Sequence, residues 1–130
     1  MKNEKTKGMI EAEISDALVK FEKDYMGRGP VETRTYIVED MIIVRLKGVL
    51  TRAEEQLASG DEGLVLIKQV RVKLLEKARS LLESIISDIT GCAIKSMHTD
   101  ISITTGERVI IFTLDRDLEE KILSARTKKD

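Results

Sequence analysis

The sequence predicts a two-layer α+β domain in which two antiparallel β-hairpins pack against amphipathic helices. Apolar residues recur at steps of three and four in some segments and at steps of two in others, with Gly-containing breaks between them. The order α-β-β-α occurs twice along the chain. A length of 130 residues suits a single domain with one core. We expect an ordered core over about residues 9–125, with charged tails at 1–7 and 126–130.

An amphipathic helix is expected first. Its apolar residues share one face: Met9, Ile10, Ile14, Ala17, Leu18, Phe21 and Tyr25. The segment Gly27-Arg28-Gly29-Pro30 predicts the end of this helix, because glycine adopts the left-handed cap conformation and Pro30 lacks a backbone donor.

The first hairpin is predicted from dense β-branched residues at 33–38 and 41–46, with Glu39-Asp40 as the turn. Gly48 ends the second strand. Thr51 and Glu54 have the spacing of a capping box, which predicts a short helix that ends near Gly60.

One long helix is predicted over residues 62–89. Its main apolar stripe is Ile67, Val70, Leu74, Ala78, Leu81, Ile85 and Ile89, and four further residues widen it: Leu66, Leu75, Leu82 and Ile86. The wider stripe exceeds what one sheet face usually covers, so we expect a homodimer through this helix.

Thr90-Gly91 predicts the end of the long helix, and residues 93–103 and 108–114 predict a second hairpin. Asp115 or Asp117 is expected to cap a last helix that contains Leu118, Ile122 and Leu123. The repeated order indicates either an internal duplication or simply the alternation needed to cover a sheet.

Composition excludes several classes of function. With 22 basic and 23 acidic residues, no Trp and 3% aromatic residues, the chain offers neither the field nor the stacking surfaces that nucleic acids bind. Cys92 is the only cysteine, which excludes an intramolecular disulfide. We see neither a secretory signal nor a run apolar enough to insert into a membrane, and we expect a cytoplasmic protein.

Few residues are candidates for chemistry. His98 and Asp100 should share the polar face of a strand, with Met97, Thr99 and Ile101 on the opposite face. A His-x-Asp pair can orient a base or bind a metal, but a polar strand face or a dimer contact is the simpler interpretation. One histidine and one thiol cannot complete a common zinc site, and Cys92 is interpreted as structural.

Anion binding has two candidate sites. Gly27-Arg28-Gly29-Pro30 could present backbone amides to an anion, although its place after a helix favours a helix stop. Arg34 and Arg45 could share a face of the first hairpin, and Arg108 and Lys95 a face of the second, where nearby Glu and Asp could also pair with them. Neither GxGxxG nor GxxxxGK[ST] occurs, so no cofactor is expected.

Several ordered blocks together resemble the MpsC family. They are Gly27-Arg28-Gly29-Pro30, Asp40-Met41-Ile42-Ile43-Val44, Gly48-Val49-Leu50-Thr51 with Glu54, His98-Thr99-Asp100-Ile101-Ser102, and Thr105-Gly106-Glu107-Arg108. The resemblance covers about residues 10–123. It implies a bacterial cytoplasmic protein associated with a sodium-translocating, membrane-potential-generating system linked to inorganic carbon uptake. It implies no reaction and transfers no catalytic residue.

The sequence therefore favours a small accessory or regulatory protein, acting through protein-protein interaction as a homodimer and associated with a membrane transport complex. The alternative is an anion- or nucleotide-binding sensor in which Arg28 and Arg45 hold the ligand and His98 responds to pH. An enzyme is less favoured. The candidate ligand-binding positions are Gly27, Arg28, Gly29, Pro30, Arg45, His98, Asp100 and Glu107.

Overall fold

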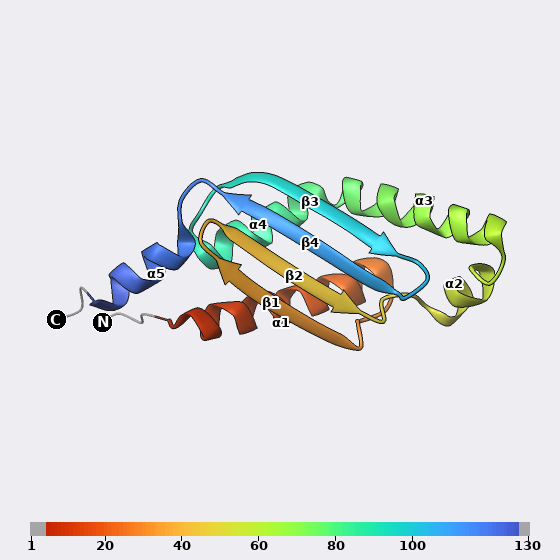
Figure 1. Ribbon diagram of the computed structural model, residues 1–130, viewed down its shortest axis with the longest axis horizontal. Coiled ribbons are helices and arrows are strands. Elements are labelled where there is room, and N and C mark those ends of the chain that lie inside the picture. The colour runs from red at the N-terminus through yellow and green to blue at the C-terminus, as the bar shows by residue number, and fades with distance from the viewer. Residues whose placement is uncertain (1–4, 128–130) are drawn as a thin grey trace.

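The computed structural model describes residues 5–127, which form five helices and four strands (Figure 1). In chain order they are α1 (Lys7–Met26), β1 (Glu32–Val38), β2 (Met41–Lys47), α2 (Arg52–Leu57), α3 (Asp61–Lys77), α4 (Arg79–Thr90), β3 (Ile94–Ser102), β4 (Glu107–Leu114) and α5 (Leu118–Thr127).

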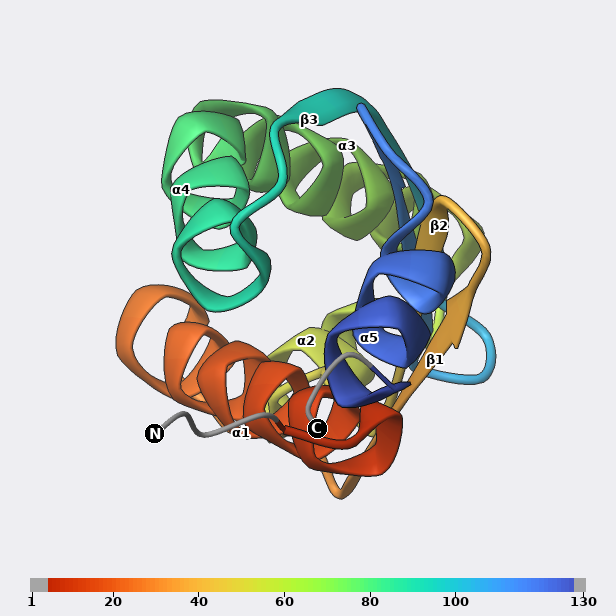
Figure 2. The same cartoon turned by 90° about the vertical axis from the view of Figure 1, so that its left-hand side faces the viewer.

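The strands form one antiparallel sheet in the order β1-β2-β4-β3. The two hairpins join within the chain through β2 and β4, whose register runs from Met41 opposite Thr113 to Leu46 opposite Arg108. Figures 1 and 2 show the helices on one side of this sheet. The predicted α+β class, with two hairpins carried by helices, is confirmed.

The core lies between the sheet and the helices and is almost wholly aliphatic. Ile42, Val44 and Ile110 are fully buried on the inner face of the sheet, and Ile14 and Leu18 of α1 are fully buried opposite them. Helices α1 and α4 also contact each other, which closes the helical layer. Period-two burial along β2 and β4 leaves the alternate residues on the other face.

Most local signals are confirmed. Gly27 ends α1 in the left-handed conformation, with φ 92°, and Gly91 ends α4 in the same way. Glu39-Asp40 forms the turn between β1 and β2. Thr51 and Glu54 form the reciprocal capping box of α2. Of the two candidate caps for α5, Asp117 accepts a hydrogen bond from the Glu120 N–H at 2.9 Å.

The first and last helices extend further than the sequence predicts. Helix α1 begins at Lys7, because the Thr6 side chain accepts a hydrogen bond from the backbone N–H of Met9. Helix α5 continues to Thr127. The rest of the predicted tails, residues 1–4 and 128–130, lies outside the described part of the chain.

The prediction of one helix over 62–89 is wrong. The chain turns at Ala78, which is buried with φ −88° and ψ 1°, and its N–H is shared between the carbonyls of Leu74 and Leu75. Helix α3 contacts β3 and α2, whereas α4 contacts α1 as well as β3. One straight helix could not follow both surfaces, so the break lets each half pack on its own neighbours.

The predicted apolar stripe is also wrong by about one residue. The buried line along α3 and α4 consists of Gly63, Ile67, Arg71, Leu75, Ala78, Leu82 and Ile86. Leu75, Leu82 and Ile86 therefore pack inside the chain and are not dimer contacts, while Leu66, Val70 and Leu81 are exposed. The prediction missed the buried line because it considered only apolar residues, and the middle of this line is occupied by Arg71.

We predict that Gly63→Ala destabilises the fold by about 2 kcal/mol or more. A Cβ at Gly63 would lie 1.8 Å from the carbonyl oxygen of Leu57, where the end of α2 meets α3. Gly60→Ala is the matched control, since a Cβ there has no atom within 4 Å. Urea unfolding of both variants measures the difference, and equal stabilities would show that the close approach is not limiting.

Candidate functional site

One face of the sheet is uncovered in the described chain, and we call it the open face. It comprises Glu32, Arg34, Tyr36 and Val38 of β1, Met41, Ile43, Arg45 and Lys47 of β2, Glu107, Val109, Ile111 and Thr113 of β4, and Ser96, His98, Asp100 and Ser102 of β3. It faces the viewer in Figure 1, with α1 and α4 behind the strands.

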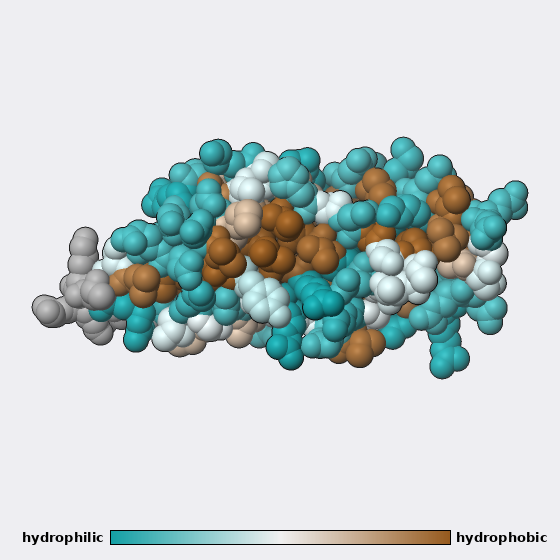
Figure 3. Space-filling view, viewed as in Figure 1, coloured by the Kyte–Doolittle hydropathy of each residue, from teal (hydrophilic) through white to brown (hydrophobic). Residues whose placement is uncertain are grey.

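The centre of the open face is apolar. Ile43 lies opposite Ile111 across the β2–β4 pair, and Val109 and Met41 lie beside them. These four side chains are half-buried, although no helix within residues 5–127 packs on them. Figure 3 shows this as a brown apolar patch surrounded by hydrophilic surface. An apolar patch with a polar rim is typical of a protein-binding surface.

Charged residues cluster at one end of the open face. Arg34 lies directly opposite Arg45, so two like charges face each other across β1 and β2. Glu107 pairs with Arg45, and Glu32 pairs with Arg34 at 3.0 Å. The hydrogen bond that Arg45 donates to the Glu107 carboxylate raises the pKa of Arg45. The predicted shared face of Arg34 and Arg45 is confirmed.

His98 and Asp100 lie on the open face, as the strand alternation requires, with Met97 and Ile101 buried on the inner face. The His98 Nε2 atom is 3.1 Å from the Ser96 Oγ atom. Asp100 accepts a hydrogen bond from Lys68 of α3 at 2.7 Å, which lowers the pKa of this carboxyl. Among residues 5–127, no three His, Cys, Asp or Glu residues come together in a way that could hold a metal ion.

The fold thus brings Arg45, His98, Asp100 and Glu107 onto one surface and places the glycine-rich segment elsewhere. Arg28 donates a hydrogen bond to the Leu50 carbonyl at 2.8 Å, in the connection between β2 and α2. A shallow hollow on the open face is lined by Glu32, Arg34, Tyr36, Arg45 and Lys47, a set that contains neither Arg28 nor His98.

The predicted pairing of Arg108 with Lys95 on one strand face is wrong. Arg108 is only 1% exposed and lies on the inner face, opposite Ile101, whereas Lys95 is exposed where the register between β3 and β4 shifts. The shift between Ile94 and Ser96 adds one residue to β3, which breaks the simple alternation there.

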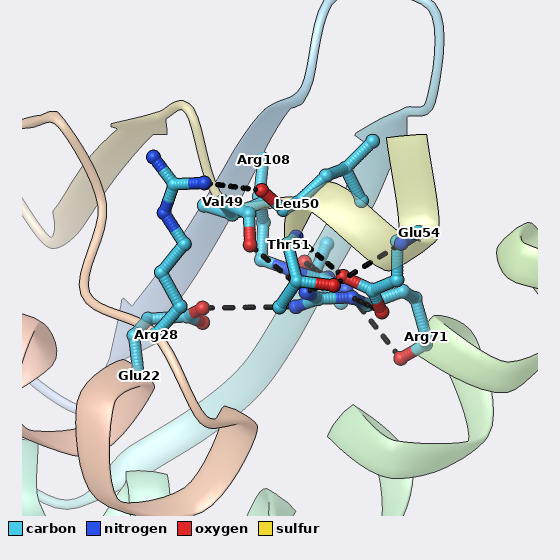
Figure 4. A network of polar contacts seen from close by, with 9 residues as sticks. Glu22, Arg28, Val49, Leu50, Thr51, Glu54, Arg71 and Arg108 are labelled. Carbon is cyan, nitrogen blue, oxygen red and sulfur yellow. Dashed lines mark hydrogen bonds and ion pairs between the residues drawn. The ribbon is translucent and has the colours of Figure 1, made fainter. Parts of the chain in front are cut away.

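Arg108 belongs to a buried charge cluster that sequence reasoning missed (Figure 4). We define this cluster as Glu22, Glu54, Arg71 and Arg108. The Arg71 guanidinium donates to both Glu54 carboxylate oxygens, at 2.6 and 3.0 Å, and to the Val49 carbonyl at 2.9 Å. Its Nη1 atom is 3.8 Å from Glu22 Oε1. Arg71 therefore links α3 to α1, α2 and the end of β2.

Burial dominates the electrostatics of the cluster. Desolvation raises the pKa of Glu22, opposed by the charges of Arg108 and Arg71. Desolvation also lowers the pKa of Arg108 to about 10, which leaves it charged at neutral pH. Partial burial acts to raise the pKa of Glu54, but hydrogen bonds from Arg71 and Thr51 outweigh it and lower the pKa overall. The cluster thus combines two guanidinium groups and two carboxyl groups.

Several polar atoms of the cluster lack a hydrogen-bond partner in the described chain. They are both carboxylate oxygens of Glu22, Nη1 of Arg71 and Nε of Arg108. Arg108 is held by the Thr99 hydroxyl at 2.8 Å and the Arg71 carbonyl at 3.4 Å. One feature of the sequence could have indicated this cluster. Arg71 is four residues from both Ile67 and Leu75, which are buried, so the three side chains share one face of the helix.

The fold and the open face define a small α+β domain with one uncovered sheet surface. This chain belongs to the MpsC family, because its residues 6–116 match the family described as the Na+-translocating membrane potential-generating system (MpsC). The predicted family resemblance is confirmed.

Two proteins of Bacillus subtilis (strain 168) are similar to this chain. One, named "Uncharacterized protein YbcI", is 52% identical over 122 residues, which cover 92% of this chain and 98% of the relative. The other, named "Uncharacterized protein YrhF", is 27% identical over 110 residues, which cover 84% of this chain and 90% of the relative. No solved structure matches the chain significantly. Within residues 5–127, every helix is too short or too polar to cross a bilayer.

We predict that Arg71→Met destabilises the fold by about 3 to 5 kcal/mol, because it leaves the buried Glu22 and the partly buried Glu54 carboxylates without their shared cation. Arg79→Met is the control: it removes an exposed ion pair with Glu83 and should cost less than about 1 kcal/mol. Chemical unfolding of the two variants tests this. If Arg71→Met lowered the free energy of unfolding no more than the control does, the linking role of the cluster would be contradicted.

Proposed function

We propose that this protein is an accessory component of a sodium-translocating, membrane-potential-generating system and acts by binding proteins through its open face. The observation that carries the proposal is the uncovered apolar centre at Ile43 and Ile111. A chain of this size usually covers such a surface with its own helices unless another protein covers it.

The family description supplies the context of the proposal. The helices of the described chain do not span a membrane, so association with a membrane system would require a binding surface. The charged residues around the apolar centre are already ion-paired, which suits the rim of an interface better than a catalytic centre. We further propose a cytoplasmic location and self-association as a homodimer.

The cellular test uses an open-face variant. The gene is deleted in the organism that encodes this protein, and the wild-type protein is then expressed in the deletion strain. We expect it to restore the sodium dependence of the membrane potential, measured with a potential-sensitive dye. Ile43→Glu should fail, because a charge at the apolar centre cannot be buried under a partner. Met9→Glu places the same charge on an exposed position of α1 and should restore function.

Folding of both variants is checked by circular dichroism and thermal unfolding. An unchanged membrane potential in cells without the gene would reject the link to this system. Full activity of a folded Ile43→Glu protein would reject the open face as the binding surface.

The second candidate function is an anion- or nucleotide-binding sensor. It is favoured by the hollow on the open face, where three cationic side chains, Arg34, Arg45 and Lys47, meet one carboxylate, Glu32. A ligand that binds only the folded state stabilises it by about 2.7 kcal/mol at 100 times its dissociation constant. We expect a thermal shift with bicarbonate, phosphate or a nucleotide that is lost in Arg45→Gln. No shift across this panel rejects the sensor.

A further inference from the structure

The side chains of the open face form four rows across the sheet, each running from β1 through β2 and β4 to β3. The strand register places Arg34, Arg45, Val109 and Asp100 in one row, and Tyr36, Ile43, Ile111 and His98 in the next. The outer row at one end is Val38, Met41, Thr113 and Ser96. At the other end Glu32 pairs with Lys47 and Glu107 with Ser102, and continuing the β2–β4 register by one residue beyond Leu46 and Arg108 brings these two pairs into one row.

Charge is divided between the two halves of the open face. The β1–β2 half has three basic side chains, Arg34, Arg45 and Lys47, and one acidic side chain, Glu32. The β3–β4 half has two acidic side chains, Asp100 and Glu107, and no basic one. The apolar residues Ile43 and Ile111 lie at the boundary. The surface is therefore basic on one side, acidic on the other and apolar between them.

Such a surface is complementary to itself. If two copies stack face to face about a two-fold axis parallel to the strands, each row meets the same row of the partner in reverse order, so β1 lies over β3 and β2 over β4. Arg34 then faces the partner's Asp100, and Lys47 faces the partner's Glu107. Ile43 packs on the partner's Ile111. Isologous contacts of this kind are the usual basis of homodimers.

We propose that the open face is a self-association surface and that two copies pack sheet against sheet in this orientation. The proposal rests on the proposed function, since it names the occupant of the same face. Sheets pack about 10 Å apart with strands within about 30° of each other. The long Arg34 side chain is 63% exposed and that of Asp100 is 82% exposed, so both can reach across the offset that this angle creates.

The charges discriminate between possible orientations. A two-fold axis in the interface plane but perpendicular to the strands would place β1 on β1 and reverse the order of the rows, so that Arg34 would lie over the partner's Tyr36 and Arg45 over its Ile43. In that orientation the basic side chains would gain no acidic partner, and burying an unpaired charge is costly. The ion pair between Asp100 and Lys68 does not block the proposed contact, because both hydrogen bonds to this carboxylate use Oδ1.

The size of the face sets the expected affinity. Four strands spaced by about 4.8 Å and about seven residues long cover roughly 20 Å by 23 Å. This footprint belongs to the smaller class of specific interfaces, so we expect a dissociation constant in the micromolar range. The protein should be monomeric at low and dimeric at high micromolar concentration.

A reciprocal charge exchange tests the orientation. Arg34→Asp alone and Asp100→Arg alone should each weaken the dimer by at least about tenfold, because each homodimer then contains two like-charge contacts. An equimolar mixture should form a 1:1 heterodimer with restored affinity, since both contacts between the two variants are of opposite charge. Sedimentation velocity over the micromolar range, with one variant fluorescently labelled, measures all three affinities.

Lys68→Ala is the matched control. It removes the partner of Asp100 within the chain and leaves the open face itself intact, so dimerisation should persist. Thermal unfolding checks that every variant is folded. We expect all of them to be folded, because positions 34, 68 and 100 lie outside the core.

Three results would overturn the proposal. They are a wild-type protein that stays monomeric at high micromolar concentration, a mixture without restored affinity, and a dimer that survives both exchanges but is lost in Leu66→Glu or Leu81→Glu. The last result would place the interface on α3 and α4. A monomeric wild type together with an inactive Ile43→Glu in cells would reject the self-association and leave the accessory role standing, with another protein on the open face.

Discussion

The buried Arg71 guanidinium is the interaction on which the arrangement of the helices depends. A charge that is 1% exposed must be compensated within the protein, and its partners come from three other segments: Glu22 of α1, Glu54 of α2 and the Val49 carbonyl after β2. Arg108 extends the cluster to β3 and β4 through Thr99. Movement of any one of these segments would leave a charge unpaired, so their positions are coupled.

The helices linked by the cluster cover the sheet on one side only. Glu22 and Arg71 of the cluster link α1 to α3, and α4 packs against both of these helices over the inner face. Their buried stripes are used there, and no described helix is left for the other face. The open face consequently keeps half-buried apolar side chains such as Ile43 and Ile111 at its centre. The same constraint that fixes the core thus creates the surface to which we assign binding.

The order of the strands gives the open face its symmetry. Joining two hairpins through β2 and β4 places equivalent strands at equivalent distances from the centre, so each row has a β1–β2 half and a β4–β3 half. The two halves differ in charge, as Arg34 and Asp100 illustrate. The two hairpins of the repeated α-β-β-α order thus form one sheet, whether or not the repeat arose by duplication. Other members of the MpsC family can be examined for the same division of charge.

The sequence by itself determined the elements whose signals are local. The period-two geometry of a strand predicted that His98 and Asp100 share one face, and the caps at Gly27, Thr51 and Gly91 lie where side-chain and glycine chemistry required them. Only the tertiary structure decided the break at Ala78, the burial of Arg71 and Arg108, and the meeting of Arg45 with Glu107. These features depend on contacts between segments distant in sequence, and a buried ion pair is invisible to an apolar pattern because its members are polar and its energy comes from their proximity.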